Sequence, residues 1–314
     1  MRVGVFGAGA VGAYFGGRLI ETGKHDVSLI ARGPHLDALQ TRGLRIESPE
    51  GDADLPSDAF TATSNPEDVG QVDAIFVTVK TWMVPEAGVA IRPMVGDKTT
   101  VVPLQNGVEA PDQLATGVSG GHVIGGTCRI FTDIVEPGVV RHTGVPPTIT
   151  IGELDGSASE TVEEIHAALS DAGIFATARA DIRAALWEKL MFVGPLGGVG
   201  AVTRVPIGVF RSVPRSRELL EACMEEIAAV AAAEGVSLPS NAVEGAMKLA
   251  DLAPVDGTAS MQRDIASGRP SELEAQVGVI PRLGQRHHVP TPAHDAIYAA
   301  LLPSELKARG QLTW

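Results

Sequence analysis

Three glycines near the N-terminus, Gly7, Gly9 and Gly12, have the spacing of a phosphate-binding turn. They follow the apolar segment 3–6 and precede a segment whose apolar residues recur at helical spacing. In such a strand–turn–helix unit, the glycines allow a tight turn, a close approach of the backbone to a pyrophosphate, and close packing of helix on strand. The candidate dinucleotide-binding residues are therefore Gly7, Ala8, Gly9, Ala10, Val11 and Gly12, with a purely structural turn as the alternative.

The end of the second expected strand, 26–31, indicates which dinucleotide would fit. NAD sites usually place an acid there for the ribose 2′-hydroxyl, but this strand is followed by Arg32. A guanidinium can bind a 2′-phosphate through two parallel hydrogen bonds, so the sequence favours NADP over NAD. Lys80 follows another expected strand, 74–79, where ligands bind in such sheets. Ordinary surface positions for Arg32 and Lys80 are the alternative.

The elements that must position these residues alternate along the first half of the chain. We expect strands over 3–6, 26–31, 74–79 and 99–104, and helices starting at Val11 and covering 84–91 and 109–114. Alternating strands and helices predict an α/β domain with a parallel sheet and right-handed crossovers. Between 121 and 153, short β-rich pieces with turn residues between them predict antiparallel strands added to that sheet.

Helical patterning dominates from residue 159 to the end of the chain, apart from the short apolar piece 174–177. We expect helices over 181–190, 216–234 and 264–276. A boundary at Arg179 therefore separates an α/β domain, 1–179, from a mostly α-helical domain, 180–314. The alanine-rich helix 216–234 could serve the core or a subunit contact, which leaves a homodimer open.

Composition and charge limit the classes of protein and partner. The chain has 314 residues, 44% of them apolar, and a formal net charge of −13. That charge argues against a nucleic-acid or anionic-membrane surface. No segment reaches the roughly 20 apolar residues of a membrane span, and the early glycines argue against a cleaved signal peptide. Cys128 and Cys223 suggest neither a disulfide framework nor a metal site, so we expect a cytoplasmic protein without bound metal.

Together, these motifs resemble the ketopantoate reductase (2-dehydropantoate 2-reductase) family. The matching pieces follow the family's order: GAGAVG at 7–12, the arginine of IARG, VTVK ending at Lys80, LQNG with Asn106, RAALWEKL with Lys189, and SMQRDI and SELE with Ser260 and Glu272. The resemblance implies a Rossmann domain followed by a helical domain, with the substrate in the cleft between them. It also implies NADPH-dependent reduction of a 2-oxo acid to a 2-hydroxy acid, as in pantothenate biosynthesis.

The resemblance also implies roles for single residues. Lys189 would donate a proton to the carbonyl oxygen, and Ser260 would help to hold the substrate carboxylate. Asn106 would lie beside nicotinamide and substrate, while Glu272 would contact the nicotinamide side of the cofactor or position Lys189. A ketone oxygen gains negative charge as hydride arrives, so an ammonium that stabilises and protonates it is sound chemistry. Taken alone, each residue could be an ordinary surface or turn residue.

At four positions the chain departs from the asparagines of the family. They are Val193, Gly197, Ile207 and Gly257. Discrimination for a hydroxyl depends on hydrogen-bonding partners, so these replacements favour a less polar or differently anchored substrate. Ketopantoate itself, another oxo acid or ketone, and a non-catalytic NADP-binding sensor are the alternatives that the sequence leaves open.

Overall fold

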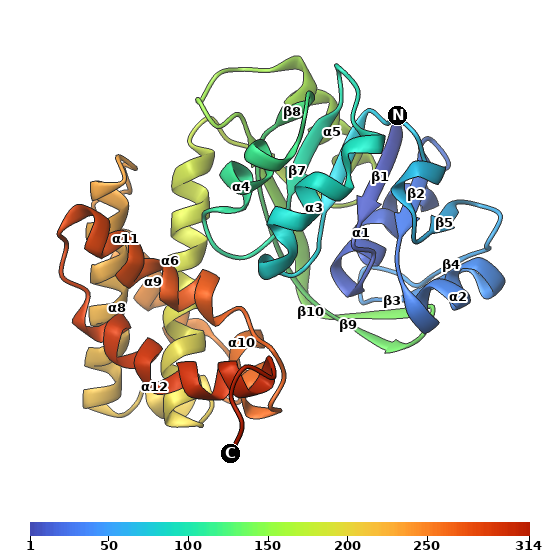
Figure 1. Ribbon diagram of the computed structural model, residues 1–314. Helices are drawn as coiled ribbons and strands as arrows, with labels where there is room; N and C mark the ends of the chain where they lie inside the picture. The colour runs from blue at the N-terminus through green and yellow to red at the C-terminus, as the bar shows by residue number, and fades with distance from the viewer. The chain divides into compact units, whose positions relative to one another are not determined.

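The computed structural model describes residues 1–314, and the chain forms two compact units (Figure 1). The first unit comprises residues 1–105 and 109–182, and the second comprises residues 106–108 and 183–314. The change from one unit to the other falls within the first turn of helix α6 (Ile182–Thr203), shortly after Arg179. The short segment 106–108 belongs to the second unit although it directly follows residues of the first.

A six-stranded parallel sheet with the order β5-β2-β1-β6-β7-β8 forms the centre of the first unit. Its strands are β1 (Arg2–Phe6), β2 (Asp26–Ile30), β5 (Thr61–Thr63), β6 (Ala74–Val77), β7 (Thr100–Pro103) and β8 (His122–Val123). Alternate side chains enter two cores: Val3 and Val5 pack with helix α1, whereas Phe6 packs with helices α3 and α4. Burial on both faces accounts for the continuous apolar runs in these strands.

The helices of the first unit are α1 (Ala10–Glu21), α2 (Gly33–Arg42), α3 (Val84–Ala90), α4 (Ala110–Gly117) and α5 (Glu160–Asp171). Figure 1 shows α3 and α4 side by side against the sheet, and the two helices contact each other. Strand, turn and helix alternate as the sequence predicted. The predicted Rossmann-type α/β fold is confirmed.

A second sheet corrects the prediction for residues 121–153. Strands β9 (Gly125–Glu136) and β10 (Val139–Gly152) form one long antiparallel hairpin instead of short strands added to the parallel sheet. The turn between them contains Gly138, whose φ of 85° suits glycine. Strand β10 also pairs with β3 (Leu44–Glu47) and β11 (Phe175–Ala178), and β3 pairs with β4 (Ala53–Leu55).

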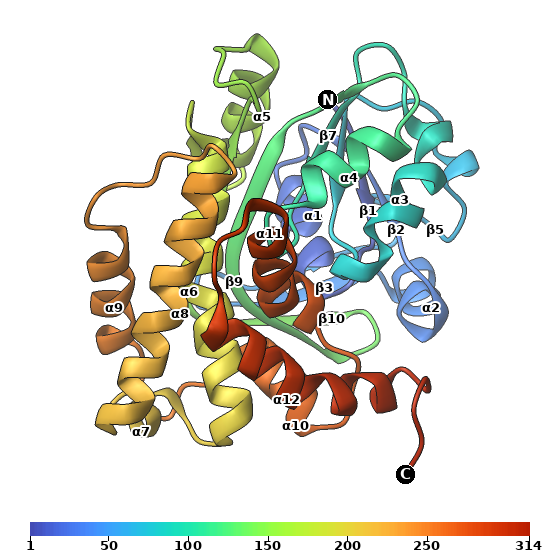
Figure 2. The ribbon, with the colours of Figure 1, turned by 60° about the vertical axis from the view of Figure 1, so that its left-hand side comes forward.

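The second unit is helical and has a single apolar core. Its elements are α6, α7 (Ile207–Phe210), α8 (Pro214–Ala233), α9 (Ala242–Leu252), α10 (Ser260–Ala266), a π-helix (Glu274–Gly278), α11 (Val279–His287) and α12 (Pro292–Ala308). Helix α8 lies beside α9 (Figure 2). The α8 residues Cys223, Ile227 and Val230 are fully buried, so one face of this alanine-rich helix serves the core.

Residues 264–276 do not form the single helix that the sequence predicted. Helix α10 ends at Ala266, and Gly268 has a left-handed φ of 64°. Pro270 follows and interrupts helical hydrogen bonding, so the chain begins a new helical segment before the π-helix Glu274–Gly278. None of the helices combines the length and the apolar composition that crossing a membrane requires.

Candidate active site

The glycine-rich turn follows β1 and is closed by the neighbouring strand. The amides of Gly7 and Ala8 both donate to the carbonyl of Ile30, at 3.1 and 2.8 Å. Gly7 has a φ of 97°, and a Cβ atom there would lie 2.6 Å from Cγ1 of Val79. A Cβ at Gly12 would overlap Oγ1 of Thr78. Both glycines are therefore required by the packing of the turn itself.

Gly9 differs, because a Cβ atom there would meet nothing closer than the carbonyl oxygen of Gly7, at 3.8 Å. Gly9 is the N-cap of α1, no side chain caps this helix, and its first turn contains no acidic residue. The first intrahelical bond runs from the Ala13 amide to the Gly9 carbonyl, so the amides of Ala10, Val11 and Gly12 have no partner within the helix and lie at the positive end of its dipole. These features fit the pyrophosphate of a dinucleotide.

Thr78 supports this turn, and sequence reasoning missed it. Its hydroxyl donates to the carbonyl of Gly7 at 2.8 Å, and its backbone amide donates to the carbonyl of Phe6 at 2.9 Å. The signal was available, since Thr78 lies within the motif VTVK at the end of β6. The Thr78 hydroxyl therefore fixes the orientation of the peptide group that follows Gly7, the first glycine of the turn.

The structure brings Arg32 and Lys80 to the same edge of the sheet as the glycine turn. Strands β2, β1 and β6 are parallel neighbours, so their carboxyl ends lie together. Arg32 follows β2 as the exposed N-cap of α2, whose first turn contains no acid. Lys80 follows β6 and is also exposed. Two cations at this edge suit a phosphorylated ligand.

In the second unit, helix α6 carries Lys189, whose side chain is half-buried. Val193 and Gly197 follow at intervals of four residues and therefore lie on the same side of the helix. Ser260 is the exposed first residue of α10. Its neighbour Met261 faces Gly197, because a Cβ at Gly197 would be 2.8 Å from Cε of Met261. The start of α10 thus packs on α6, about 12 Å beyond Lys189 along the helix axis.

Asn106 and Glu272 are in direct contact within the second unit. Nδ2 of Asn106 donates to Oε2 of Glu272 at 2.8 Å, and Nε2 of Gln276 donates to the same oxygen at 3.0 Å. Glu272 and Gln276 are both buried. Asn106 therefore does more than form a turn with Gly107, because its side chain helps to hold a buried carboxylate. Sequence reasoning missed Gln276, and no motif pointed to it.

At the positions that replace the family's asparagines, the neighbouring side chains are apolar for Gly197 and Gly257, although a Cβ at Gly257 would also lie 2.9 Å from the Pro254 carbonyl oxygen. A Cβ at Gly197 would lie 3.7 Å from Cβ of Ala259, in addition to its contact with Met261. The amide of Ile207 donates to the carbonyl of Gly257 at 2.9 Å, and a Cβ at Gly257 would lie 3.4 Å from Cδ1 of Ile207. None of these contacts replaces the lost amide groups.

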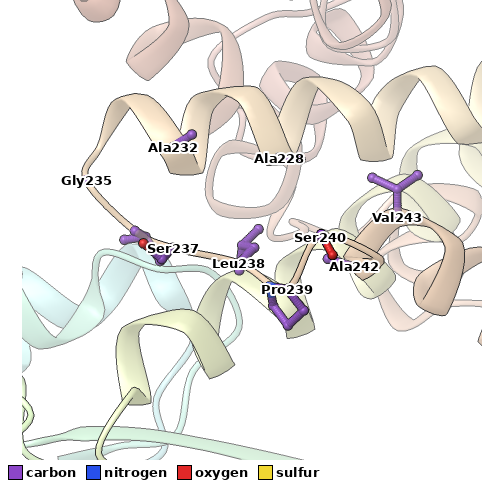
Figure 3. Close-up of a pocket in the computed structure, with 10 residues that line it drawn as sticks. Ala228, Ala232, Gly235, Ser237, Leu238, Pro239, Ser240, Ala242 and Val243 are labelled. Carbon is purple, nitrogen blue, oxygen red and sulfur yellow. The ribbon is translucent and has the colours of Figure 1, made fainter.

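A pocket of about 460 Å³ lies elsewhere on the second unit, where α8 leads into α9 (Figure 3). It contains none of the candidate site residues, and Ser237 and Ser240 provide its only polar side chains.

The buried thiol of Cys223, on α8, is a separate feature of the second unit. Burial raises the pKa of Cys223 to about 12, which makes this thiol a poor nucleophile at neutral pH.

Comparison with known proteins shows to which family the chain belongs. The family described as ketopantoate reductase PanE/ApbA matches residues 3–156, and its C-terminal counterpart matches residues 181–305. The chain is 30% identical to 2-dehydropantoate 2-reductase of Mesorhizobium japonicum over 95% of this chain and 96% of that protein. The corresponding enzyme of Halobacterium salinarum is 31% identical over 93% of this chain and 95% of the relative.

The same relationship holds in three dimensions. A PanE/ApbA family ketopantoate reductase from Ralstonia eutropha aligns with a TM-score of 0.89 and 31% identity, over 98% of this chain and all of that structure. Sequence and structure agree across both units. The chain belongs to the ketopantoate reductase PanE/ApbA family of oxidoreductases.

Proposed function

We propose that this protein is an NADPH-dependent reductase that converts a 2-oxo acid into the corresponding 2-hydroxy acid, with a 2-dehydropantoate-like substrate. The observation that supports this most strongly is made within the second unit. Helix α6 carries Lys189 and packs against the start of α10, which carries Ser260, and Asn106 is joined to Glu272 by a 2.8 Å hydrogen bond. Each of these side chains has the chemistry that its proposed step needs. Reduction in the cytoplasm is in keeping with the two buried free thiols, Cys128 and Cys223.

The first unit would hold the cofactor. The backbone amides of the first turn of α1, from Ala10 to Gly12, would bind the pyrophosphate, and Arg32 would bind the 2′-phosphate that distinguishes NADPH from NADH. Lys80 would add positive charge at the same edge. When bound, NADPH supplies the hydride that the carbonyl carbon accepts.

The second unit would act on the substrate. The hydroxyl of Ser260 donates to the substrate carboxylate, which orients the oxo acid. The Lys189 ammonium donates to the carbonyl oxygen and transfers its proton as negative charge develops there, and water then restores the lysine proton. Glu272, held by Asn106, would contact the nicotinamide side of the cofactor or orient the Lys189 amine.

A second candidate is reduction of an oxo acid whose side chain is less polar than that of 2-dehydropantoate. The apolar contacts of Gly197 with Ala259 and Met261, and of Gly257 with Ile207, favour it. A terminal hydroxyl placed against such groups would lose hydrogen bonds to water without gaining others. An unbranched apolar chain would not incur that cost.

A panel of 2-oxo acids, assayed with NADPH by the absorbance of the reduced nicotinamide, tests both candidates. The proposal expects turnover of at least one 2-oxo acid, with NADH a poorer cofactor. Preference for 2-dehydropantoate over acids with plain alkyl chains supports the first candidate, and the reverse preference supports the second. Tight NADPH binding without reduction of any acid would contradict both and favour a sensor.

A further inference from the structure

Gln276 is the buried residue that contacts Glu272 but has no role in the proposed reaction so far. Its side chain is almost completely buried, with 1% exposed. Its Nε2 atom donates to Oε2 of Glu272 at 3.0 Å, and the Asn106 amide donates to that same oxygen at 2.8 Å. Two neutral amide donors thus converge on one carboxylate oxygen. Because both donors are themselves partly or fully buried, these two hydrogen bonds fix the direction of the carboxylate.

Backbone contacts hold Gln276 against helix α6, which carries Lys189. Its amide donates to the carbonyl of Glu272 at 3.0 Å. Its own carbonyl oxygen lies so close to α6 that a Cβ at Gly194 would be 2.5 Å away. Gly194 comes five residues after Lys189, which is about 7.5 Å along the helix axis. Gln276 therefore connects the Glu272 carboxylate to a fixed point on α6.

The local helix geometry explains how this connection is made. Gln276 lies at the centre of the π-helix Glu274–Gly278, a form that is rare and often found at functional sites. The other acid of this segment, Glu274, is engaged elsewhere: its carboxylate accepts from the Tyr298 hydroxyl at 2.7 Å and from Arg282 at 3.3 Å. Of the two neighbouring glutamates, Glu272 and Glu274, it is therefore Glu272 that accepts from the Gln276 side chain.

We infer that Gln276 is a positioning residue for the oxo-acid reduction. Together with Asn106 it holds the Glu272 carboxylate in one rotamer and orientation, so that Glu272 acts on its cofactor or lysine partner from a fixed place. This inference rests on the proposed function. A carboxylate that loses one of its buried donors gains rotamer freedom.

Two substitutions of Gln276 separate positioning from packing. Gln276→Met keeps the volume and removes the donor, and we expect kcat to fall about 10- to 100-fold while the dissociation constant for NADPH stays within about twofold. Gln276→Glu keeps the shape of the side chain but places a second carboxylate next to Oε2 of Glu272. Two carboxylates in contact share a proton, so we expect the pH–rate profile to move by about one pH unit or more.

A matched control is Gln262→Met, because Gln262 is also buried and donates to a backbone carbonyl, that of Val205, at 3.0 Å. Its loss should lower thermal stability without moving the pH–rate profile. Wild-type kcat and an unchanged profile in both Gln276 variants would overturn the inference. If Gln276→Met fails to fold, the profile of Gln276→Glu decides the question.

The inference can be judged separately from the proposed function by crystal structures of the wild-type protein and of Gln276→Met. In Gln276→Met we expect the Glu272 carboxylate to leave the position in which its Oε2 atom accepts from Asn106 at 2.8 Å, or to occupy more than one rotamer. A single unchanged rotamer would overturn the inference even if the enzyme reduces 2-oxo acids. A displaced carboxylate with no turnover of any acid would contradict the proposed function and leave the contact established.

Discussion

Asn106 and Glu272 are 166 residues apart in the chain, and their side chains are joined by a 2.8 Å hydrogen bond. Asn106 lies shortly after β7, a strand of the first unit, yet residues 106–108 pack within the second unit. A Cβ at the neighbouring Gly107 would be 2.9 Å from the Ala275 carbonyl, so the peptide after Asn106 lies against the π-helix. The second unit therefore determines where this amide points.

The glycine turn gives a sharp prediction through Gly9→Ala. The added methyl group meets no protein atom closer than 3.8 Å, so folding should be unaffected. It would occupy the space proposed for the pyrophosphate, so the dissociation constant for NADPH should rise at least about tenfold, as measured by fluorescence titration. Gly245→Ala is the matched control, because Gly245 lies in α9 with no atom within 4 Å of the new methyl group. Equal NADPH affinity in both variants would exclude phosphate binding at this turn.

Gly12→Ala should behave differently from Gly9→Ala. Its methyl group would overlap Thr78 and lie 2.9 Å from Cγ1 of Val5, so the variant should unfold at a lower temperature as well as lose cofactor. Differential scanning fluorimetry with and without NADPH measures both effects. A stable Gly12→Ala protein that still binds NADPH would show that the close packing of α1 on the sheet is not needed.

Cofactor choice should depend on Arg32. Arg32→Ala should weaken NADPH binding by about 1.5–3 kcal/mol, since a charge-assisted hydrogen bond to the 2′-phosphate is lost, and should leave NADH binding nearly unchanged. Arg215→Ala removes an arginine whose side chain is 91% exposed and serves as the control. Equal losses for NADPH and NADH would contradict contact with the phosphate.

Lys189→Ala tests the proton donor. Loss of a general acid should lower kcat by about 10²- to 10⁴-fold, while NADPH binding remains close to that of the wild-type protein. Lys248→Ala is the control, because it removes only an exposed ion pair with Glu244 on α9. Turnover at the wild-type rate without Lys189 would remove it from the mechanism.

Stability in acid should depend on a buried carboxylate outside the site. Burial opposes ionisation of Glu226, but hydrogen bonds from the His294 ring and from the amides of Ala293 and His294 outweigh it and lower its pKa. The resulting stability is complete above the ordinary pKa of a glutamate and is lost as the pH falls through the lowered value.

Glu226→Gln should therefore reduce the free energy of unfolding at neutral pH by about 1–3 kcal/mol and flatten its decline in acid. Urea titrations across the acid range measure this free energy. Glu225→Gln, at an exposed position of the same helix, should leave both the free energy and its pH dependence unchanged. An acid decline as steep in Glu226→Gln as in the wild-type protein would contradict the role of this carboxylate.

The Rossmann-type sheet could be predicted because its signals are local. The turn from Gly7 to Gly12 and the buried runs of β1, β6 and β7 are each contained in a few residues. Strands β3 and β4 were missed because four- and three-residue strands have almost no periodicity of their own. The partners of β10 likewise depend on contacts between distant segments, so the second sheet could not be inferred.

In the candidate site, too, single residues could be predicted from local motifs, whereas the contacts between distant residues could not. Motifs pointed to Lys189 and Glu272 as residues, but no local pattern indicates that Gln276 and Asn106 donate to one oxygen of Glu272. The packing of Gly197 against Met261 was equally hidden, since it depends on how α10 meets α6. Residue types are local information, whereas hydrogen-bond partners are set by the fold.

Transfer of deuterium from NADPH labelled at the nicotinamide C4 position tests the central claim most directly. After incubation with each acid of the 2-oxo acid panel, mass spectrometry should show for at least one acid a 2-hydroxy acid with one deuterium on C2, in an amount equal to the NADPH oxidised. Recovery of unlabelled oxo acid with the NADPH intact, from protein that binds the cofactor and is fully folded, would contradict the account.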